Sequence, residues 1–257
     1  MDVLCFDFDG VLCDSAPETA ATAWEGCRAL WPATADASPA LPEALRARFC
    51  RLRPVMHTGF EAIPLMRLIE TDAADDAAIL ADFPTLRDGL VAREGLRRED
   101  LQQRFGAIRD RLIAADEAAW LGWNDFYAGA AALLRAALHR HTVFILTTKQ
   151  QRFAERLLAH QGLHVPDGHL FGLEAGRSKP ALLAALQARP ALAGATFHFI
   201  EDRLDTLLDV VADDALAAVR LYLADWGYNT PAQRREAAAN NRIQVVALDA
   251  FRAAVGL

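Results

Sequence analysis

The chain has 257 residues, a hydrophobic fraction of 53% and a formal net charge of −7, so it is long and apolar enough for one large domain or two smaller ones. The acidic balance argues against a nucleic-acid-binding protein, which would carry a basic surplus. The sequence has no basic stretch followed by a long apolar segment at its start and no run of 18 apolar residues. We therefore expect no contact with a membrane and a cytoplasmic location.

The chain opens on an apolar segment, Val3 to Phe6, which predicts a buried strand and leads directly into Asp7 and Asp9, followed by Gly10. Two carboxylates roughly 4 Å apart repel each other by about 4 kcal/mol at an effective dielectric constant near 20. Mg²⁺ removes such repulsion and needs only one or two carboxylates. The alternative is a strand that ends in a polar turn, where Asp-Gly is common.

The region after this first strand is predicted to be helical. Leu101, Phe105, Ile108 and Leu112 recur at the spacing of one helical face. The Pro- and Ala-rich segment 32–39 predicts a loop. Because the next convincing strand begins only at Thr142, residues 15–123 are assigned to an inserted helical subdomain.

From residue 124 onward, helices and short apolar strands alternate, which is typical of a parallel sheet covered on both faces. The strands are predicted at Thr142–Leu146, near His169–Leu173, at Thr196–Ile200, at Ala218–Leu223 and at Ile243–Leu248. The helices are predicted at Ala130–His139, at Arg152–His160, at Ala181–Ala188 and around Leu204, Leu207, Leu208 and Val211. The predicted fold is therefore α/β, with a doubly wound, Rossmann-like parallel sheet formed by residues 1–14 and 124–257.

Polar side chains follow three of these strands. They are Asp7 and Asp9 after the first strand, Thr147, Thr148 and Lys149 after the Thr142 strand, and Glu201 and Asp202, with Asp205 one turn on, after the Thr196 strand. Since ligands bind at the carboxyl ends of parallel strands, these groups are expected to converge on one site. Lys179, just before Pro180 and a helix start, adds an ammonium group. Taken singly, each residue can be explained without a functional site. Thr147 would be an ordinary strand residue, Lys179 a solvated surface lysine, and Glu201-Asp202 the N-cap of the following helix.

The order of these motifs resembles the haloacid dehalogenase superfamily of hydrolases. The matching segments are Asp7-x-Asp9-Gly10-Val11, the strand to Thr147, Lys179-Pro180, and the strand to Glu201-Asp202-x-x-Asp205. Region 15–123 resembles, by its placement, the superfamily's helical cap domain. Residues 124–129 are similar to the hinge where the chain returns to the core, although Ala128 stands where proline is usual. Residues 225–228 resemble a tryptophan-glycine turn. Members of the phosphoglycolate phosphatase and β-phosphoglucomutase kind show the most similar pattern.

This resemblance implies a Mg²⁺-dependent phosphatase that acts on a small phosphorylated metabolite. Asp7 would be the nucleophile that forms an aspartyl-phosphate, and Asp9 the general acid and base. Mg²⁺ is expected at Asp7, at Asp202 and at the main-chain carbonyl of Asp9. Thr147 would bind a phosphoryl oxygen, and Lys179 would offset the charge on Asp7 and the phosphate.

Four further residues are expected to support this site. They are Gly10, Thr148, Glu201 and Asp205, the last by anchoring either Lys179 or the following helix. Glu201 stands where many members have glycine, a variant also seen among sugar-phosphate mutases, and Thr148 replaces a frequent asparagine. Both departures leave the substrate class open.

Three readings of the function remain open. Asp9 favours phosphate over halide chemistry, because a displaced halide needs no general acid. A phosphomutase would use the same residues, and a non-catalytic sensor or scaffold would bind a phosphorylated ligand without turnover.

The cap is expected to select the substrate, with Arg53, His57 and Thr58 as candidate contacts, although a solvated helix face followed by a glycine turn would explain the same pattern. We expect a monomer or a weak homo-oligomer.

Overall fold

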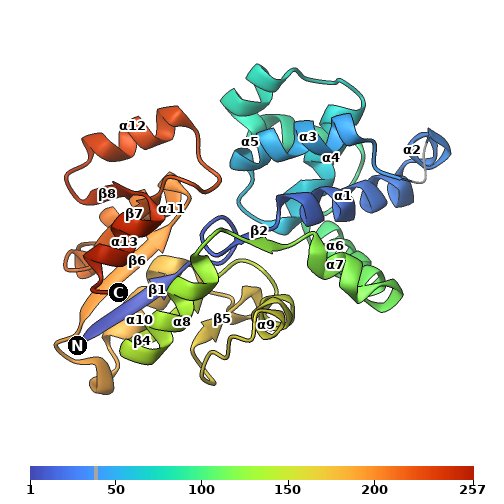
Figure 1. Cartoon of the computed structure of the whole chain (residues 1–257). Coiled ribbons are helices and arrows are strands. Elements are labelled where there is room, and N and C mark those ends of the chain that lie inside the picture. The colour runs from blue at the N-terminus through green and yellow to red at the C-terminus, as the bar shows by residue number, and fades with distance from the viewer. Residues whose placement is uncertain (38–39) are drawn as a thin grey trace. The chain divides into compact units, whose positions relative to one another are not determined.

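The computed structural model describes residues 1–37 and 40–257, and the chain divides into two compact units (Figure 1). The first unit contains Met1–Asp14 and Asp125–Leu257, and the second contains Ser15–Asn124. The second unit is therefore an insertion between two segments of the first.

The first unit is built on a parallel six-stranded sheet with the strand order β5-β4-β1-β6-β7-β8. The strands are β1 (Asp2–Phe6), β4 (Thr142–Leu146), β5 (Leu170–Phe171), β6 (Thr196–Glu201), β7 (Arg220–Ala224) and β8 (Ile243–Val246). The central strands β1 and β6 are buried from their second residue onward, as is typical of strands covered on both faces. The predicted α/β, Rossmann-like sheet is confirmed.

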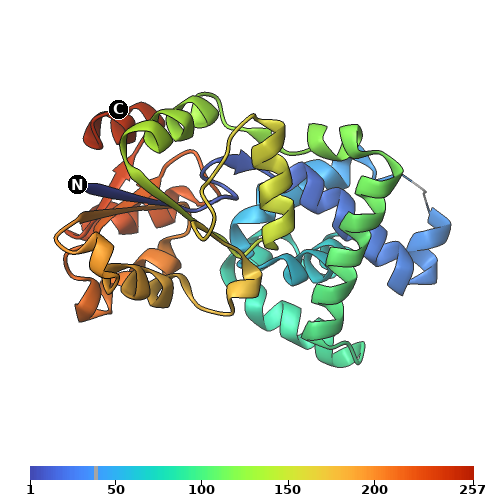
Figure 2. The ribbon, with the colours of Figure 1, turned by 90° about the horizontal axis from the view of Figure 1, so that it is seen from below.

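Helices cover both faces of this sheet. They are α8 (Ala130–Arg140), α9 (Gln151–His160), α10 (Lys179–Gln187), α11 (Leu204–Val211), α12 (Pro231–Ala239) and α13 (Leu248–Ala254). Successive residues of β1 point to opposite faces, so Val3 and Cys5 pack in one core with α10 and α11, whereas Phe6 meets Phe251 of α13 edge to face. Figure 2 shows α10 and α11 (orange) on one side of the sheet and α8 (green) and α13 (dark red) on the other.

Several predicted strands have different ends in the structure. The strand predicted at Ile243–Leu248 ends at Val246, and Leu248 begins α13, where Phe251 is fully buried. The strand predicted at Ala218–Leu223 begins at Arg220, because the N–H of Val219 donates to the carbonyl of Leu216 in a turn. A short apolar run does not by itself distinguish a strand from an adjoining helical turn.

A two-residue ribbon lies where the chain leaves and re-enters the first unit. Strand β2 (Cys13–Asp14) pairs antiparallel with β3 (Asp125–Phe126). The hydroxyl of Tyr228 donates to Oδ1 of Asp14 at 2.7 Å. The ribbon is thus tied to the turn that follows β7.

The second unit is helical, as predicted. Its helices are α1 (Ala16–Leu30), α2 (Pro32–Ala37), α3 (Glu43–Leu52), α4 (Ala62–Glu70), α5 (Asp76–Arg93), α6 (Arg98–Ala115) and α7 (Glu117–Gly122). Helix α1 packs against α3, α4 and α6. The shared core includes Phe49, Ile63, Met66 and Phe105. Within the described part of the chain, no helix combines the length and apolarity needed to cross a membrane.

The loop predicted for residues 32–39 is wrong over Pro32–Ala37, which forms α2. Proline suits the first position of a helix, where its missing N–H is not needed. Thr34 is buried and hydrogen-bonds to Glu70 of α4, which fixes this short helix to the unit. Ser38 and Pro39 lie outside the described residues.

Candidate active site

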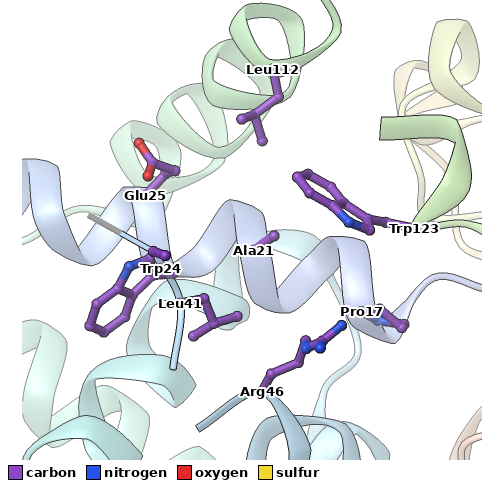
Figure 3. Close-up of a pocket in the computed structure, with 9 residues that line it drawn as sticks. Pro17, Ala21, Trp24, Glu25, Leu41, Arg46, Leu112 and Trp123 are labelled. Atoms are coloured by element: carbon purple, nitrogen blue, oxygen red, sulfur yellow. The ribbon is translucent and has the colours of Figure 1, made fainter. Parts of the chain in front are cut away.

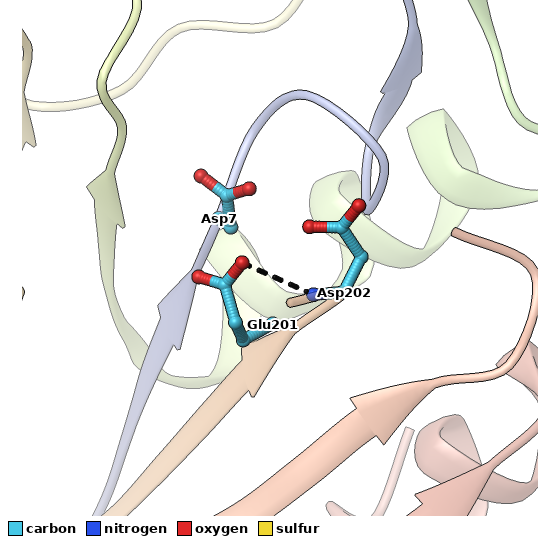
Figure 4. A group of neighbouring side chains, drawn as sticks. All are labelled: Asp7, Glu201 and Asp202. Atoms are coloured by element: carbon cyan, nitrogen blue, oxygen red, sulfur yellow. Dashed lines mark hydrogen bonds between the residues drawn. The ribbon is translucent and has the colours of Figure 1, made fainter. Parts of the chain in front are cut away.

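Two neighbouring strands bring three acids together. Asp7 directly follows β1, while Glu201 ends β6 and Asp202 follows it. The register pairs Phe6 with Ile200, and the N–H of Asp7 donates to the carbonyl of Ile200 at 3.0 Å. The three buried carboxylates each offer an oxygen, and these oxygens lie within 4.8 Å of one another (Figure 4). The sequence-based expectation named Asp7 and Asp202 as metal ligands with the main-chain carbonyl of Asp9, so Glu201 is the additional acid in this cluster.

Lys179 joins this cluster as the first residue of α10. Its Nζ lies 2.7 Å from Oδ1 of Asp7 and 2.6 Å from Oε2 of Glu201. Ser178 caps the helix and Pro180 occupies its first turn, so the helix start places the lysine at the sheet edge. With its side chain only 12% exposed, Lys179 is not a solvated surface lysine.

Burial is the main electrostatic influence on these groups. It raises the pKa of Asp7 to about 7, assisted by the charge of Glu201 and opposed by Lys179. It also raises the pKa of Glu201 to about 7, opposed by Lys179 and assisted by Asp202. For Lys179, burial acts to lower the pKa, but the charges of Asp7 and Glu201 outweigh it and raise the pKa above its ordinary value.

The donor set fits a hard divalent cation. The cluster contains three carboxylates and one lysine, which pairs with Asp7 and Glu201, so two negative charges remain in excess when all three acids are ionised. Oxygen ligands of this kind are the ones that Mg²⁺ prefers. A bound divalent cation would balance that charge and oppose the effect of burial on the carboxylates.

Two glycines allow the loops around Asp202 to approach closely. Gly10 has φ +91°, and a Cβ there would lie 2.1 Å from Oδ2 of Asp202. A Cβ on Gly227 would lie 2.3 Å from Cβ of Asp202 and 2.5 Å from the carbonyl oxygen of Gly10. Side chains at these positions would displace the acid.

The turn after β7 holds Asp202 directly. The N–H of Tyr228 donates to Oδ2 of Asp202 at 2.7 Å, and Nδ2 of Asn229 donates to its carbonyl oxygen at 2.9 Å. The resemblance includes Tyr228 in the tryptophan-glycine turn without a role, and Asn229 lies one residue beyond that turn. The turn can be recognised in the sequence, but the residue that it contacts depends on the tertiary structure.

The residues after β4 form a second polar group. The hydroxyl oxygen of buried Thr147 accepts the N–H of Lys149 at 3.0 Å, which leaves the hydroxyl proton for another acceptor. Nζ of Lys149 lies 3.0 Å from Oδ1 of Asp9. Thr148 is exposed. The sequence places Lys149 at the strand end but does not indicate its pairing with Asp9.

Asp205 supports the start of its own helix. In the first turn of α11, its Oδ2 accepts from Nη2 of Arg203 at 2.9 Å and its Oδ1 from the N–H of Thr206 at 3.2 Å. Glu201 is the residue that takes the partner role, since its side chain is fully buried and reaches Nζ of Lys179.

The candidate substrate residues of the helical unit lie in one turn region. Arg53 begins the 3₁₀ turn Arg53–Val55, and His57 and Thr58 precede the next turn, Gly59–Glu61. The buried carboxylate of Glu61 accepts the N–H groups of His57 and Thr58 and pairs with Arg87. His57 is exposed, whereas Arg53 and Thr58 are half-buried.

The helical unit also contains a cavity of about 380 Å³. Trp24 and Trp123 are among its lining residues, together with Ala21 of α1 and Leu112 of α6 (Figure 3). Arg53, His57 and Thr58 do not line it. The cavity and the predicted substrate residues are therefore separate features of this unit.

Solved structures with the same fold match almost the whole chain. A predicted phosphatase from Clostridium acetobutylicum is 15% identical, with a TM-score of 0.59 and coverage of 99% of this chain and 97% of that one. A haloacid dehalogenase-like family protein from Streptococcus pneumoniae is 14% identical, with a TM-score of 0.57 and coverage of 99% and 97%. A predicted phosphoglycolate phosphatase from Haemophilus somnus is also 14% identical, with a TM-score of 0.57 and coverage of 99% and 96%.

Curated proteins give no match to this sequence. The family model described as haloacid dehalogenase-like hydrolase matches residues 1–218, which include the motifs from Asp7 to Asp205. The chain belongs to the haloacid dehalogenase-like hydrolase family.

Proposed function

We propose that this hydrolase is a Mg²⁺-dependent phosphatase that acts on a small phosphorylated metabolite. The observation that carries the proposal is the buried group of Asp7, Asp202, Glu201 and Lys179, with Asp9 two residues beyond Asp7. The fold is shared with proteins named as phosphatases, one of them a predicted phosphoglycolate phosphatase. Their names support this reaction class for the chain.

The reaction begins with transfer of the phosphoryl group to the protein. A carboxylate oxygen of Asp7 attacks phosphorus, and the bond from phosphorus to the ester oxygen breaks. Asp9 gives its proton to the departing oxygen, which leaves as an alcohol. The covalent route divides a very slow hydrolysis into two easier steps.

Water completes the reaction. The carboxylate of Asp9 removes a proton from a water molecule, and the water oxygen attacks phosphorus. The bond from phosphorus to Asp7 breaks, inorganic phosphate is released and the Asp7 carboxylate is restored.

The surrounding residues bind and neutralise the phosphoryl group. Lys179 offsets the negative charge of Asp7 and of the phosphoryl oxygens, and the hydroxyl of Thr147 donates to one of those oxygens. Asp7, Asp202 and the main-chain carbonyl of Asp9 would hold Mg²⁺. When bound, the ion supplies positive charge to the phosphoryl oxygens.

Activity of the Asp7→Asn variant tests this proposal. We expect Mg²⁺-dependent hydrolysis of p-nitrophenyl phosphate by the wild type and none by Asp7→Asn. Asp209→Asn, an exposed acid on α11, is the matched control and should retain activity. Undiminished activity of Asp7→Asn would overturn the proposal.

A panel of phosphorylated metabolites then separates the alternatives. Release of inorganic phosphate supports the phosphatase. A product that carries the phosphate on another oxygen would identify a phosphomutase, and thermal stabilisation without turnover would identify a binding protein.

The helical unit is proposed to act as the cap that selects the substrate. Arg53, His57 and Thr58 would contact it, and Glu61 supports the backbone of His57 and Thr58 by accepting their N–H groups. Arg53→Ala should raise KM for the metabolite while the protein stays folded, and an unchanged KM would contradict this role. Exposed Arg51 provides the control. The expectation of a cytoplasmic enzyme that is monomeric or weakly oligomeric stays a prediction.

A further inference from the structure

We propose that Lys149 is a positioning residue that holds the carboxyl group of Asp9 for proton transfer. This inference rests on the proposed function and assigns a role to a residue that the four recognised motifs leave without one. Nζ of Lys149 lies 3.0 Å from Oδ1 of Asp9. The lysine side chain is 1% exposed and that of Asp9 is 15% exposed.

The backbone of Lys149 is fixed on both sides. Its N–H donates to Oγ1 of Thr147 at 3.0 Å, and its carbonyl oxygen accepts the N–H of Leu173 at 2.9 Å. A buried ammonium group is costly unless it is paired. The backbone of Lys149 is therefore held in place by hydrogen bonds, and its ammonium group is paired with Asp9.

The two lysines of the site contact different acids. Lys179 contacts Asp7 and Glu201, whereas Lys149 contacts Asp9. The nucleophile and the proton carrier thus each have a cation of their own. This separation predicts that removing one lysine affects a different step from removing the other.

The chemistry of the leaving group distinguishes these roles. An alkoxide needs a proton as it departs, so its release depends on a correctly placed acid. The p-nitrophenolate ion is a good leaving group and departs without one. Loss of Lys149 should therefore slow release from an alkyl phosphate much more than release from p-nitrophenyl phosphate.

Single-turnover release of the alcohol or phenol, with enzyme in excess and Mg²⁺ present, isolates this first step. We expect Lys149→Met to slow release from glycerol phosphate about 100-fold, within the usual contribution of a general acid, and release from p-nitrophenyl phosphate only about 3-fold. Lys149→Arg should restore part of the loss. Lys179→Met should slow both substrates to a similar degree.

Asp9→Asn provides the double-mutant cycle. If Lys149 acts through Asp9, then Lys149→Met adds no further loss of rate in the Asp9→Asn background. A second readout needs neither metal nor substrate: the shifts in urea unfolding midpoint caused by Lys149→Met and Asp9→Asn should be non-additive. Lys149→Gln serves as a second variant if Lys149→Met does not fold.

Equal losses on both leaving groups, or a further loss in the Asp9→Asn background, would overturn the positioning role. The result is separable from the proposed function. Full activity of Asp7→Asn overturns the phosphatase itself, whereas an inactive Asp7→Asn together with equal losses for Lys149→Met overturns only the role of Lys149.

Discussion

Lys179 and Asp7 form a largely buried ion pair at the carboxyl end of the central strand β1, with 2.7 Å between Nζ and Oδ1. Removing one partner of such a pair leaves the other charge buried and uncompensated, which costs on the order of 3 kcal/mol. We therefore expect Lys179→Met to lower the free energy of unfolding by about this amount, as measured by urea unfolding without metal.

The control for this prediction is Arg177→Met, because Arg177 is an exposed cation two residues away. Its stability should stay near that of the wild type. If Lys179→Met and Arg177→Met are equally stable, the Lys179–Asp7 ion pair does not stabilise the folded protein.

The raised pKa values of Asp7 and Glu201 predict how stability depends on pH. Both rise from their ordinary values to about 7 because of burial, so between these values the folded protein binds more protons than the unfolded chain. The contribution of Asp7 and Glu201 to the free energy of unfolding therefore falls as pH rises towards 7 and is lowest above pH 7. The Asp7→Asn variant lacks one of these groups.

Urea unfolding in EDTA, measured from pH 4 to pH 9, tests this sign. Above pH 7, we expect metal-free Asp7→Asn to be more stable than the metal-free wild type, and added Mg²⁺ to stabilise the wild type more. A wild type that gains stability relative to Asp7→Asn as pH rises would contradict the prediction.

Gly10 is expected to be essential for the position of Asp202. A Cβ at Gly10 would meet Oδ2 of Asp202 at 2.1 Å, and φ there is +91°. Gly10→Ala should therefore weaken Mg²⁺ binding as well as stability, measured by the Mg²⁺ concentration needed for half-maximal stabilisation.

Gly168→Ala separates crowding from backbone strain. Gly168 has φ +74°, but an added Cβ has nothing within 4 Å. The Gly168→Ala variant should lose about 1 kcal/mol of stability, because alanine is strained in the left-handed conformation, and should keep its Mg²⁺ affinity. Equal Mg²⁺ affinities in both alanine variants would show that the close approach to Asp202 is not important.

The helical unit has a buried ion pair of its own. Glu18 is fully buried, pairs with Arg109 and accepts hydrogen bonds from Thr22 and Trp120. Glu18→Ala should destabilise this unit by about 3–5 kcal/mol. Four of the five tryptophans belong to the unit, so tryptophan fluorescence reports mainly on its unfolding.

Glu25 is the matched control for Glu18. It also pairs with arginines, Arg28 and Arg111, but its side chain is 25% exposed. Glu25→Ala should cost about 1 kcal/mol or less. A similar loss in both variants would mean that burial of the Glu18 pair has no special effect.

The sequence located the core acids because they follow strands that lie side by side. Asp7 and Asp202 could be predicted to converge from the alternation of apolar strands and helices, and Lys179 from its place at a helix start. These features depend on local pattern and on a general property of parallel sheets. The sheet itself was predictable for the same reason.

Contacts that depend on tertiary structure were not predictable. The N–H of Tyr228 reaches Asp202 only because the turn after β7 lies beside β6, and Lys149 reaches Asp9 through its side chain. The ribbon of β2 and β3 has two residues in each strand, which is too short to show an alternating pattern. Helix α2 was predicted as a loop because proline at a helix start resembles a proline that ends one.

The central claim is that Asp7 becomes phosphorylated during turnover. The most direct measurement is acid quenching of the protein during turnover of a ³²P-labelled phosphate ester with Mg²⁺, followed by peptide mapping. The label should appear on the peptide that contains Asp7, should persist in Asp209→Asn and should be absent in Asp7→Asn. Label on another residue, or label retained in Asp7→Asn, would contradict the account.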